Sequence, residues 1–84
     1  MSEIEWRQLR NLTAREIINA FNRDGFVFYN SVAPINATRH ADGRRVTVTF
    51  HRARDTFPIG TLRSMVEVQA RWTEDDLRRL SLIR

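Results

Sequence analysis

A hairpin is indicated by the segment Ala41-Asp42-Gly43-Arg44-Arg45-Val46-Thr47-Val48-Thr49-Phe50. From Arg45 onward, polar and apolar side chains alternate, which is the period of a strand with one buried face. Asp42-Gly43 is a typical turn pair, because both residues tolerate the backbone conformations of tight turns. The segment therefore predicts a turn followed by a half-buried strand, and residues 36–40 are the predicted partner strand.

The length of this turn decides which face of the sheet each side chain occupies, since a slip of one residue exchanges the two faces. A two-residue Asp42-Gly43 loop would place Ile35 opposite Phe50, on the core face. A three-residue loop, in which Gly43 is left-handed and forms a bulge, places Ile35 opposite Thr49 instead.

The three-residue loop is favoured because it keeps Arg39 and Arg45 on one outer face and buries no arginine. It also sets Thr38 opposite Val46. The outer face is then predicted to carry Ile35, Ala37, Arg39, Arg45, Thr47, Thr49 and His51.

Helices are indicated on both sides of these strands. Residues 13–23 are predicted to form a helix that begins with a capping box from Thr13 to Glu16 and is stopped by Asp24-Gly25. Residues 58–69 predict a second helix. A third, short helix is predicted to begin at the N-cap Thr73, with Asp76 in the place that glutamate takes in a capping box.

A first strand is predicted over residues 26–29 and a loop over residues 30–34. Residues 1–12 are interpreted as an N-terminal arm that packs on the core through Trp6, Leu9 and Leu12. The predicted fold is α+β: a helix, a three-stranded antiparallel sheet and two C-terminal helices, with the helices on one face.

The composition is that of one small domain, over residues 1–84. Apolar residues make up 42% and charged residues 29% of the chain, as in globular proteins. The chain has no cysteine and two histidines, so we expect no disulfide and no metal site, and a reducing cytoplasm is the simplest location. No segment has the roughly 20 apolar residues of a membrane span, so no membrane partner is expected.

Positive charge is concentrated in one stretch. The net charge is +4 and all 14 basic residues are arginines. Five of them lie between residues 39 and 54, where Asp42 is the one acid, so this stretch alone holds +4: Arg39, Arg44, Arg45, Arg52 and Arg54. A local basic patch is typical of a nucleic-acid binder, with the arginines contacting phosphates. A solvated hairpin tip is the alternative interpretation.

Several blocks, in order and at matching spacing, resemble the HicA (YcfA-like) family over about residues 12–83. The matching blocks are Thr13-Ala14-Arg15-Glu16, Asp24-Gly25-Phe26, Asp42-Gly43-Arg44-Arg45-Val46-Thr47-Val48 and Gly60-Thr61-Leu62-Arg63. The resemblance implies an mRNA interferase toxin of a type II toxin–antitoxin pair, a metal-independent endoribonuclease with no cofactor. It also implies a fold like that of double-stranded-RNA-binding domains, RNA as substrate and a HicB-like antitoxin as protein partner.

The family's catalytic histidine is missing from its place. The family has Gly-Ser-His where this chain has Ala33-Pro34-Ile35, and the family's core tyrosine corresponds to Thr38. Histidine suits metal-free RNA cleavage because its pKa lies near neutrality, and isoleucine cannot move a proton. We therefore expect impaired cleavage, with His51 and His40 as the two substitute histidines.

Two alternatives to a HicA-like nuclease remain open. The chain could be a non-catalytic module that binds RNA or sequesters the antitoxin. It could also be a decayed gene product that folds and has no specific activity.

Overall fold

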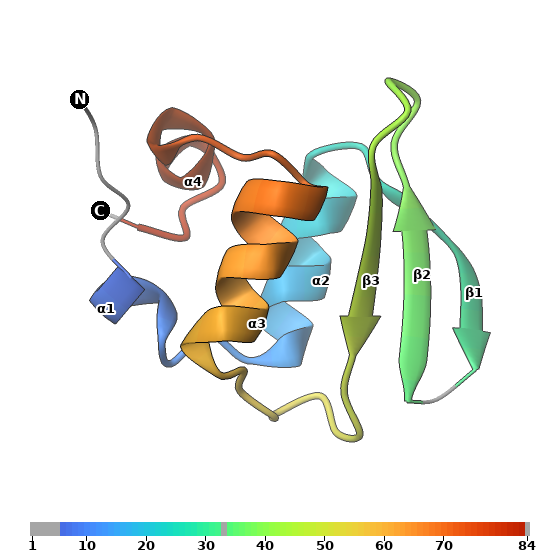
Figure 1. Cartoon of the computed structure of the whole chain (residues 1–84), viewed down its shortest axis with the longest axis horizontal. Helices are drawn as coiled ribbons and strands as arrows, with labels where there is room; N and C mark the ends of the chain where they lie inside the picture. The colour runs from blue at the N-terminus through green and yellow to red at the C-terminus, as the bar shows by residue number, and fades with distance from the viewer. Residues whose placement is uncertain (1–5, 33, 84) are drawn as a thin grey trace.

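The computed structural model describes residues 6–32 and 34–83. Within them, three strands form one antiparallel sheet in the order β1-β2-β3: β1 (Val27–Val32), β2 (Ile35–Arg39) and β3 (Arg45–Thr49). Figure 1 shows these strands on the right of the molecule and the helices on the left. The predicted α+β class with a three-stranded antiparallel sheet is confirmed.

The loop between β2 and β3 is the three-residue loop that the sequence favours. The amide of His40 donates to the carbonyl oxygen of Arg44 (2.8 Å), and the amide of Gly43 donates to the carbonyl oxygen of His40 (3.0 Å). Gly43 has a φ angle of 99°, which places it in the left-handed region where glycine is favoured. This is the predicted bulge, so the register of the hairpin is fixed by Gly43.

The observed register pairs Ile35 with Thr49, and Thr38 with Val46. Thr38 is fully buried on the inner face, whereas Ile35 is 50% exposed. The predicted outer face is confirmed, with Ala37 half-buried and the other six members exposed: Ile35, Arg39, Arg45, Thr47, Thr49 and His51.

β1 extends further than the sequence predicts. Residues 30–32 belong to the strand, so the predicted loop over residues 30–34 is wrong for these positions. Antiparallel pairing with β2 keeps them extended, and Val32 lies opposite Ile35. Composition is a weak guide here because the strand depends on its neighbour rather than on its own residues. Ala33, between the two strands, is outside the described residues.

Helix α2 (Ala14–Arg23) begins and ends as predicted. The hydroxyl oxygen of Thr13 accepts a hydrogen bond from the amide of Glu16 (3.3 Å), and the Glu16 carboxylate accepts one from the amide of Thr13 (3.0 Å). Gly25 follows the helix with a φ angle of 97°. The capping box and the glycine stop signal are both confirmed.

The C-terminal helices also follow the prediction. Helix α3 (Ile59–Arg63) continues without a break into the π-helical turn η1 (Ser64–Gln69), which together match the predicted residues 58–69. Helix α4 (Glu74–Arg79) has a second capping box, between Thr73 and Asp76.

The predicted N-terminal arm contains a short helix, α1 (Trp6–Leu9), and residues 1–5 of the arm are outside the described residues. Leu9 is fully buried, and Trp6 and Leu12 pack against the core. The described part of the arm therefore packs as expected.

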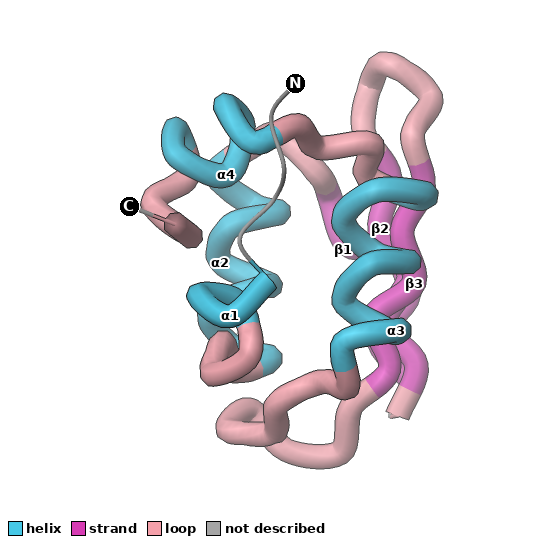
Figure 2. Tube along the Cα trace, turned by 60° about the vertical axis from the view of Figure 1, so that its left-hand side comes forward, coloured by secondary structure: helices cyan, strands magenta, loops and turns pink. Residues whose placement is uncertain are grey.

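The helices lie on one face of the sheet (Figure 2). Between them and the inner face lies one hydrophobic cluster: Leu9, Ala14, Ile17, Ala20, Phe21, Phe26, Val46, Val48, Phe57, Leu62, Met65, Val66, Ala70, Trp72, Leu77, Leu80, Leu82 and Ile83. None of the described helices combines the length and apolar character of a membrane-spanning helix. The opposite face of the sheet carries no helix among the described residues. This outer face is therefore the candidate binding surface.

Candidate nucleic-acid interface

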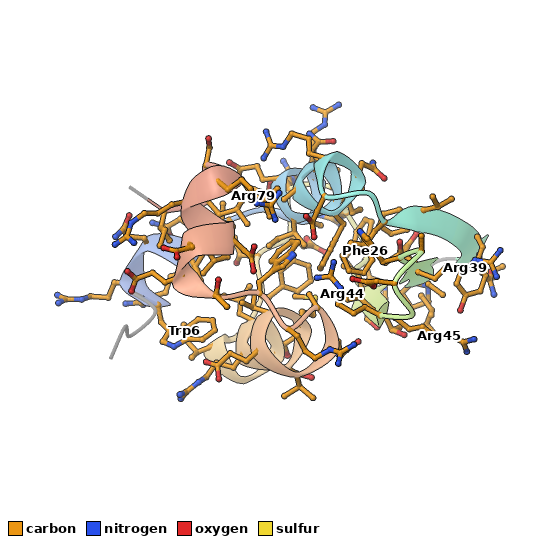
Figure 3. The ribbon with its side chains drawn as sticks, turned by 90° about the horizontal axis from the view of Figure 1, so that it is seen from above. Trp6, Phe26, Arg39, Arg44, Arg45 and Arg79 are labelled. Atoms are coloured by element: carbon orange, nitrogen blue, oxygen red, sulfur yellow. The ribbon has the colours of Figure 1, made fainter. Side chains whose placement is uncertain are left out.

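Two arginines stand together at the hairpin end of the outer face. Arg39, the last residue of β2, is paired directly with Arg45, the first residue of β3. Both side chains are exposed, and they point away from the helices in Figure 3. Two like charges on opposite strands repel each other. An anion bound between them relieves that repulsion, so this pair is a suitable phosphate contact.

Two further arginines and a histidine lie beyond the other end of the strands. His51, Arg52 and Arg54 belong to the loop after β3, and their side chains are exposed. Arg45 and Thr49 are four positions apart along β3, or about 13 Å at 3.3 Å per residue. Positive charge is therefore present at both ends of the strands.

This loop is held in place by its backbone. The carboxylate of Asp55 accepts hydrogen bonds from the amides of His51 (3.1 Å) and Arg52 (2.9 Å). The amide of Arg52, with that of His51, keeps the pKa of the Asp55 carboxyl below its ordinary value. The amides of Ala14 and Arg15 donate to the loop carbonyls of Asp55 (2.7 Å) and Ala53 (2.9 Å). The loop thus satisfies two amides at the start of α2, which fixes the backbone that carries the two arginines.

Arg44 is predicted to contact phosphate, but its side chain does not lie on this surface. Its side chain is 15% exposed and points toward the helices (Figure 3). The guanidinium donates to the Ala70 carbonyl oxygen (2.7 Å) and to the Asp42 carboxylate (2.7 Å). It also lies 5.0 Å from the centre of the Phe26 ring. With these partners, Arg44 attaches the hairpin to the end of η1 and is not presented to a ligand.

Asp24 is the acid around which this part of the structure is organised. Its carboxylate is 8% exposed. It accepts hydrogen bonds from Trp72 Nε1 (2.8 Å) and from Arg79 (2.7 Å), and Arg44 lies 3.5 Å away. Asp24 thereby joins the end of α2 to the hairpin and to the C-terminal segment that contains Trp72 and Arg79.

His40, one of the two substitute histidines, is also engaged in the fold. Its Nε2 lies 2.8 Å from the carbonyl oxygen of Asp24, and its Nδ1 accepts a hydrogen bond from the amide of Asp42 (3.1 Å). The ring packs edge-on against Phe26, 5.1 Å between centroids. Both ring nitrogens therefore already have partners, and the ring connects the hairpin to the end of α2.

His51 and Ile35 lie at the same end of the sheet, because Ile35 pairs with Thr49, two residues before His51. The Ile35 side chain is an exposed aliphatic group that can neither accept nor donate a proton. Among the described residues, His51 is therefore the exposed imidazole available to this face. No three His, Cys, Asp or Glu side chains are grouped as a metal site would require within residues 6–32 and 34–83.

Strand β1 adds exposed apolar residues to this surface, which was not predicted from the sequence. Val27, Tyr29 and Val32 are exposed by 63%, 52% and 73%, and all three lie on this edge strand. The Arg39 guanidinium lies 5.3 Å from the centre of the Tyr29 ring. Apolar residues at alternate positions 27 and 29 were a detectable signal. It was masked because the neighbouring Phe28 is also apolar.

A scan against protein-family models gave no match for this chain, and a search of curated proteins gave none either. The relationship to the HicA family therefore remains a prediction based on the residues quoted above.

Proposed function

We propose that this protein is a HicA-like toxin component of a type II toxin–antitoxin pair that binds RNA on the outer face of its sheet and is impaired in cleavage. The observation that carries the proposal is the uncovered face of the sheet, which presents the paired Arg39 and Arg45 together with the exposed Ile35. In this proposal the α+β layer is a variant of the double-stranded-RNA-binding-like arrangement. The protein acts in the cytoplasm and is held by a HicB-like antitoxin.

Binding is proposed to depend mainly on phosphate contacts from four arginines, Arg39, Arg45, Arg52 and Arg54. Each neutralised phosphate of a single strand contributes roughly −0.7 to the slope of log affinity against log salt concentration. Four contacts correspond to a slope of about −3. Such affinity depends little on base sequence.

Impaired cleavage follows from the side chain at position 35. A general acid or base accelerates a proton-transfer step by typically about 10² to 10⁴. An isoleucine at the position of the family's histidine cannot provide this acceleration. Introducing Ile35→His on this exposed, arginine-bearing face should therefore raise the cleavage rate above that of the natural chain.

The experiment is a titration of fluorescently labelled RNA at several salt concentrations, read by fluorescence anisotropy. The natural chain is compared with Arg45→Met and with a matched control, Arg7→Met, on the exposed surface of α1. We expect Arg45→Met to weaken binding and to make the salt slope shallower by about 0.7. We expect Arg7→Met to change neither. Affinity that does not vary with salt, or equal losses in the two variants, would refute phosphate binding on this face.

The exposed apolar residues of β1 favour a second candidate function, sequestration of the antitoxin. Val27, Val32 and Ile35 form part of an apolar surface beside the arginines, and such surfaces often mark protein interfaces. Purified HicB-like antitoxin should bind the natural chain and lose affinity when Val32→Asp is introduced. Unchanged antitoxin binding by Val32→Asp would exclude this surface.

A further inference from the structure

The exposed tyrosine of β1 lies at an irregularity in the sheet. Phe28 pairs with Thr38 and Asn30 with Ala37, so Tyr29 is an extra residue with no partner on β2. Phe28 packs against the core and Tyr29 is 52% exposed. Bulges are frequent next to functional sites, where they change the direction of a side chain.

We infer that Tyr29 and Arg39 form a stacking platform for an unpaired base, which makes single-stranded RNA the preferred ligand of this face. This inference rests on the proposed RNA-binding function and specifies its ligand. The aromatic ring and the guanidinium, 5.3 Å apart, both present flat surfaces on which a base can stack.

The Tyr29–Arg39 pair lies next to β3, where the proposed phosphate contact Arg45 is located. Arg39 is paired with Arg45 across the sheet, so a phosphate held by Arg45 brings the attached nucleotide next to Arg39 and Tyr29. A duplex keeps its bases stacked inside the helix, where they cannot reach a ring on a flat sheet. A strand with free bases can satisfy both contacts at once.

The charge of Arg39 favours RNA over an apolar protein surface as the occupant. An apolar partner would remove the guanidinium from water without a counter-charge, which is costly. A phosphate supplies that counter-charge. Val27, which pairs with Arg39, has no side-chain hydrogen-bonding group, and every base has a flat face that can stack, so we expect stacking that accepts any base.

The test compares two labelled RNAs of equal length, an unstructured single strand and a duplex, at one low salt concentration. The protein variants are Tyr29→Leu, which keeps an apolar side chain without an aromatic face, and Tyr29→Phe, which keeps the face. Stacking on one aromatic residue corresponds to about 5- to 150-fold in affinity. We expect Tyr29→Leu to lose affinity for the single strand in this range and for the duplex by less than about twofold. Tyr29→Phe should retain both affinities.

The possible failures are distinguishable. If the natural chain binds RNA with the expected salt dependence but Tyr29→Leu binds the single strand normally, the stacking platform is refuted and the proposed function stands. Equal losses for single strand and duplex also refute stacking. If the natural chain binds neither RNA, both proposals fall. If Tyr29→Leu changes a dimer into a monomer with RNA binding intact, the surface belongs to self-association and not to RNA. Because Tyr29 is half exposed, unfolding curves of both variants should match that of the natural chain, and Tyr29→Ala provides a further non-aromatic variant.

Discussion

Arg44 and Arg45 are neighbours in the sequence, but Arg44 is expected to stabilise the fold and Arg45 to bind RNA. Replacing each in turn by methionine should distinguish the two roles. Methionine keeps an unbranched apolar stem and removes the guanidinium. In Arg44→Met the carbonyl oxygen of Ala70 loses its 2.7 Å hydrogen bond, and the Phe26 ring loses the cation above it.

The expected cost for Arg44→Met is roughly 2–4 kcal/mol of unfolding free energy. A hydrogen bond to a charged group contributes about 1.5–3 kcal/mol, and a cation over an aromatic ring adds about 0.5–1 kcal/mol. The ion pair with Asp42 adds little to this free energy, because the Asp42 carboxylate is 47% exposed and exposed ion pairs contribute little. Arg45 has an exposed side chain on the outer face, so Arg45→Met should change stability by less than about 0.5 kcal/mol.

The assay is urea-induced unfolding followed by tryptophan fluorescence. Trp72 is a suitable probe because it is buried, stacks on Phe21 at 4.6 Å and donates its indole N–H to Asp24. RNA affinity of each folded variant is measured in parallel. Equal stability of the two variants, or an Arg44→Met protein that is stable but defective only in RNA binding, would show that Arg44 has been assigned to the wrong role.

The remaining predictions concern stability. Thr38→Val should stabilise the fold by about 1–2 kcal/mol, because the Thr38 hydroxyl is buried with no hydrogen-bond partner among the described residues; the matched control Thr47→Val, on the exposed face, should have little effect in the same urea assay. The backbone amide of the N-cap residue Thr73 holds the pKa of Asp76 below its ordinary value. The stability that the ionised Asp76 contributes is therefore complete above about pH 4 and is lost as the pH falls through the lowered pKa. Asp76→Asn should accordingly make the unfolding free energy less dependent on pH in this acid range. If the unfolding free energy of the natural chain does not change between about pH 5 and pH 2, this role of Asp76 is contradicted. Gly25→Ala should destabilise the protein, as thermal unfolding will show, since its φ is 97° and an added Cβ would lie 3.0 Å from His40 Nε2.

The parts of the fold that depend on local signals could be predicted from the sequence. Both capping boxes, at Thr13 and Thr73, are formed as expected, because a cap involves residues only three positions apart. The hairpin register could be deduced from Gly43 together with the cost of burying an arginine. The predicted outer face followed from that register.

The roles of Arg44 and His40 could not be predicted, because their partners are distant in the sequence. Arg44 reaches Ala70, and His40 reaches the carbonyl oxygen of Asp24. Arg44 also precedes the first residue of β3, so the alternation of the strand does not determine its direction. A count of basic residues cannot distinguish an arginine that is hydrogen-bonded within the protein from one that faces solvent.

The exposed Tyr29 was missed for a different reason. Val27, Phe28 and Tyr29 are all apolar or aromatic, so the sequence does not show which of them face outward, and the bulge after Phe28 arises from the pairing of two strands. The extent of β1 depends on the same pairing, which is why residues 30–32 were predicted as a loop.

The most direct test of the central claim is a cleavage assay on the RNA that the protein binds. The natural chain is incubated with end-labelled RNA at a concentration that saturates binding, beside Ile35→His and His51→Ala. We predict that the natural chain holds the RNA and yields no more product than RNA alone, whereas Ile35→His yields product. Cleavage by the natural chain that disappears in His51→Ala would contradict the account, because an imidazole other than the missing one would then perform the reaction.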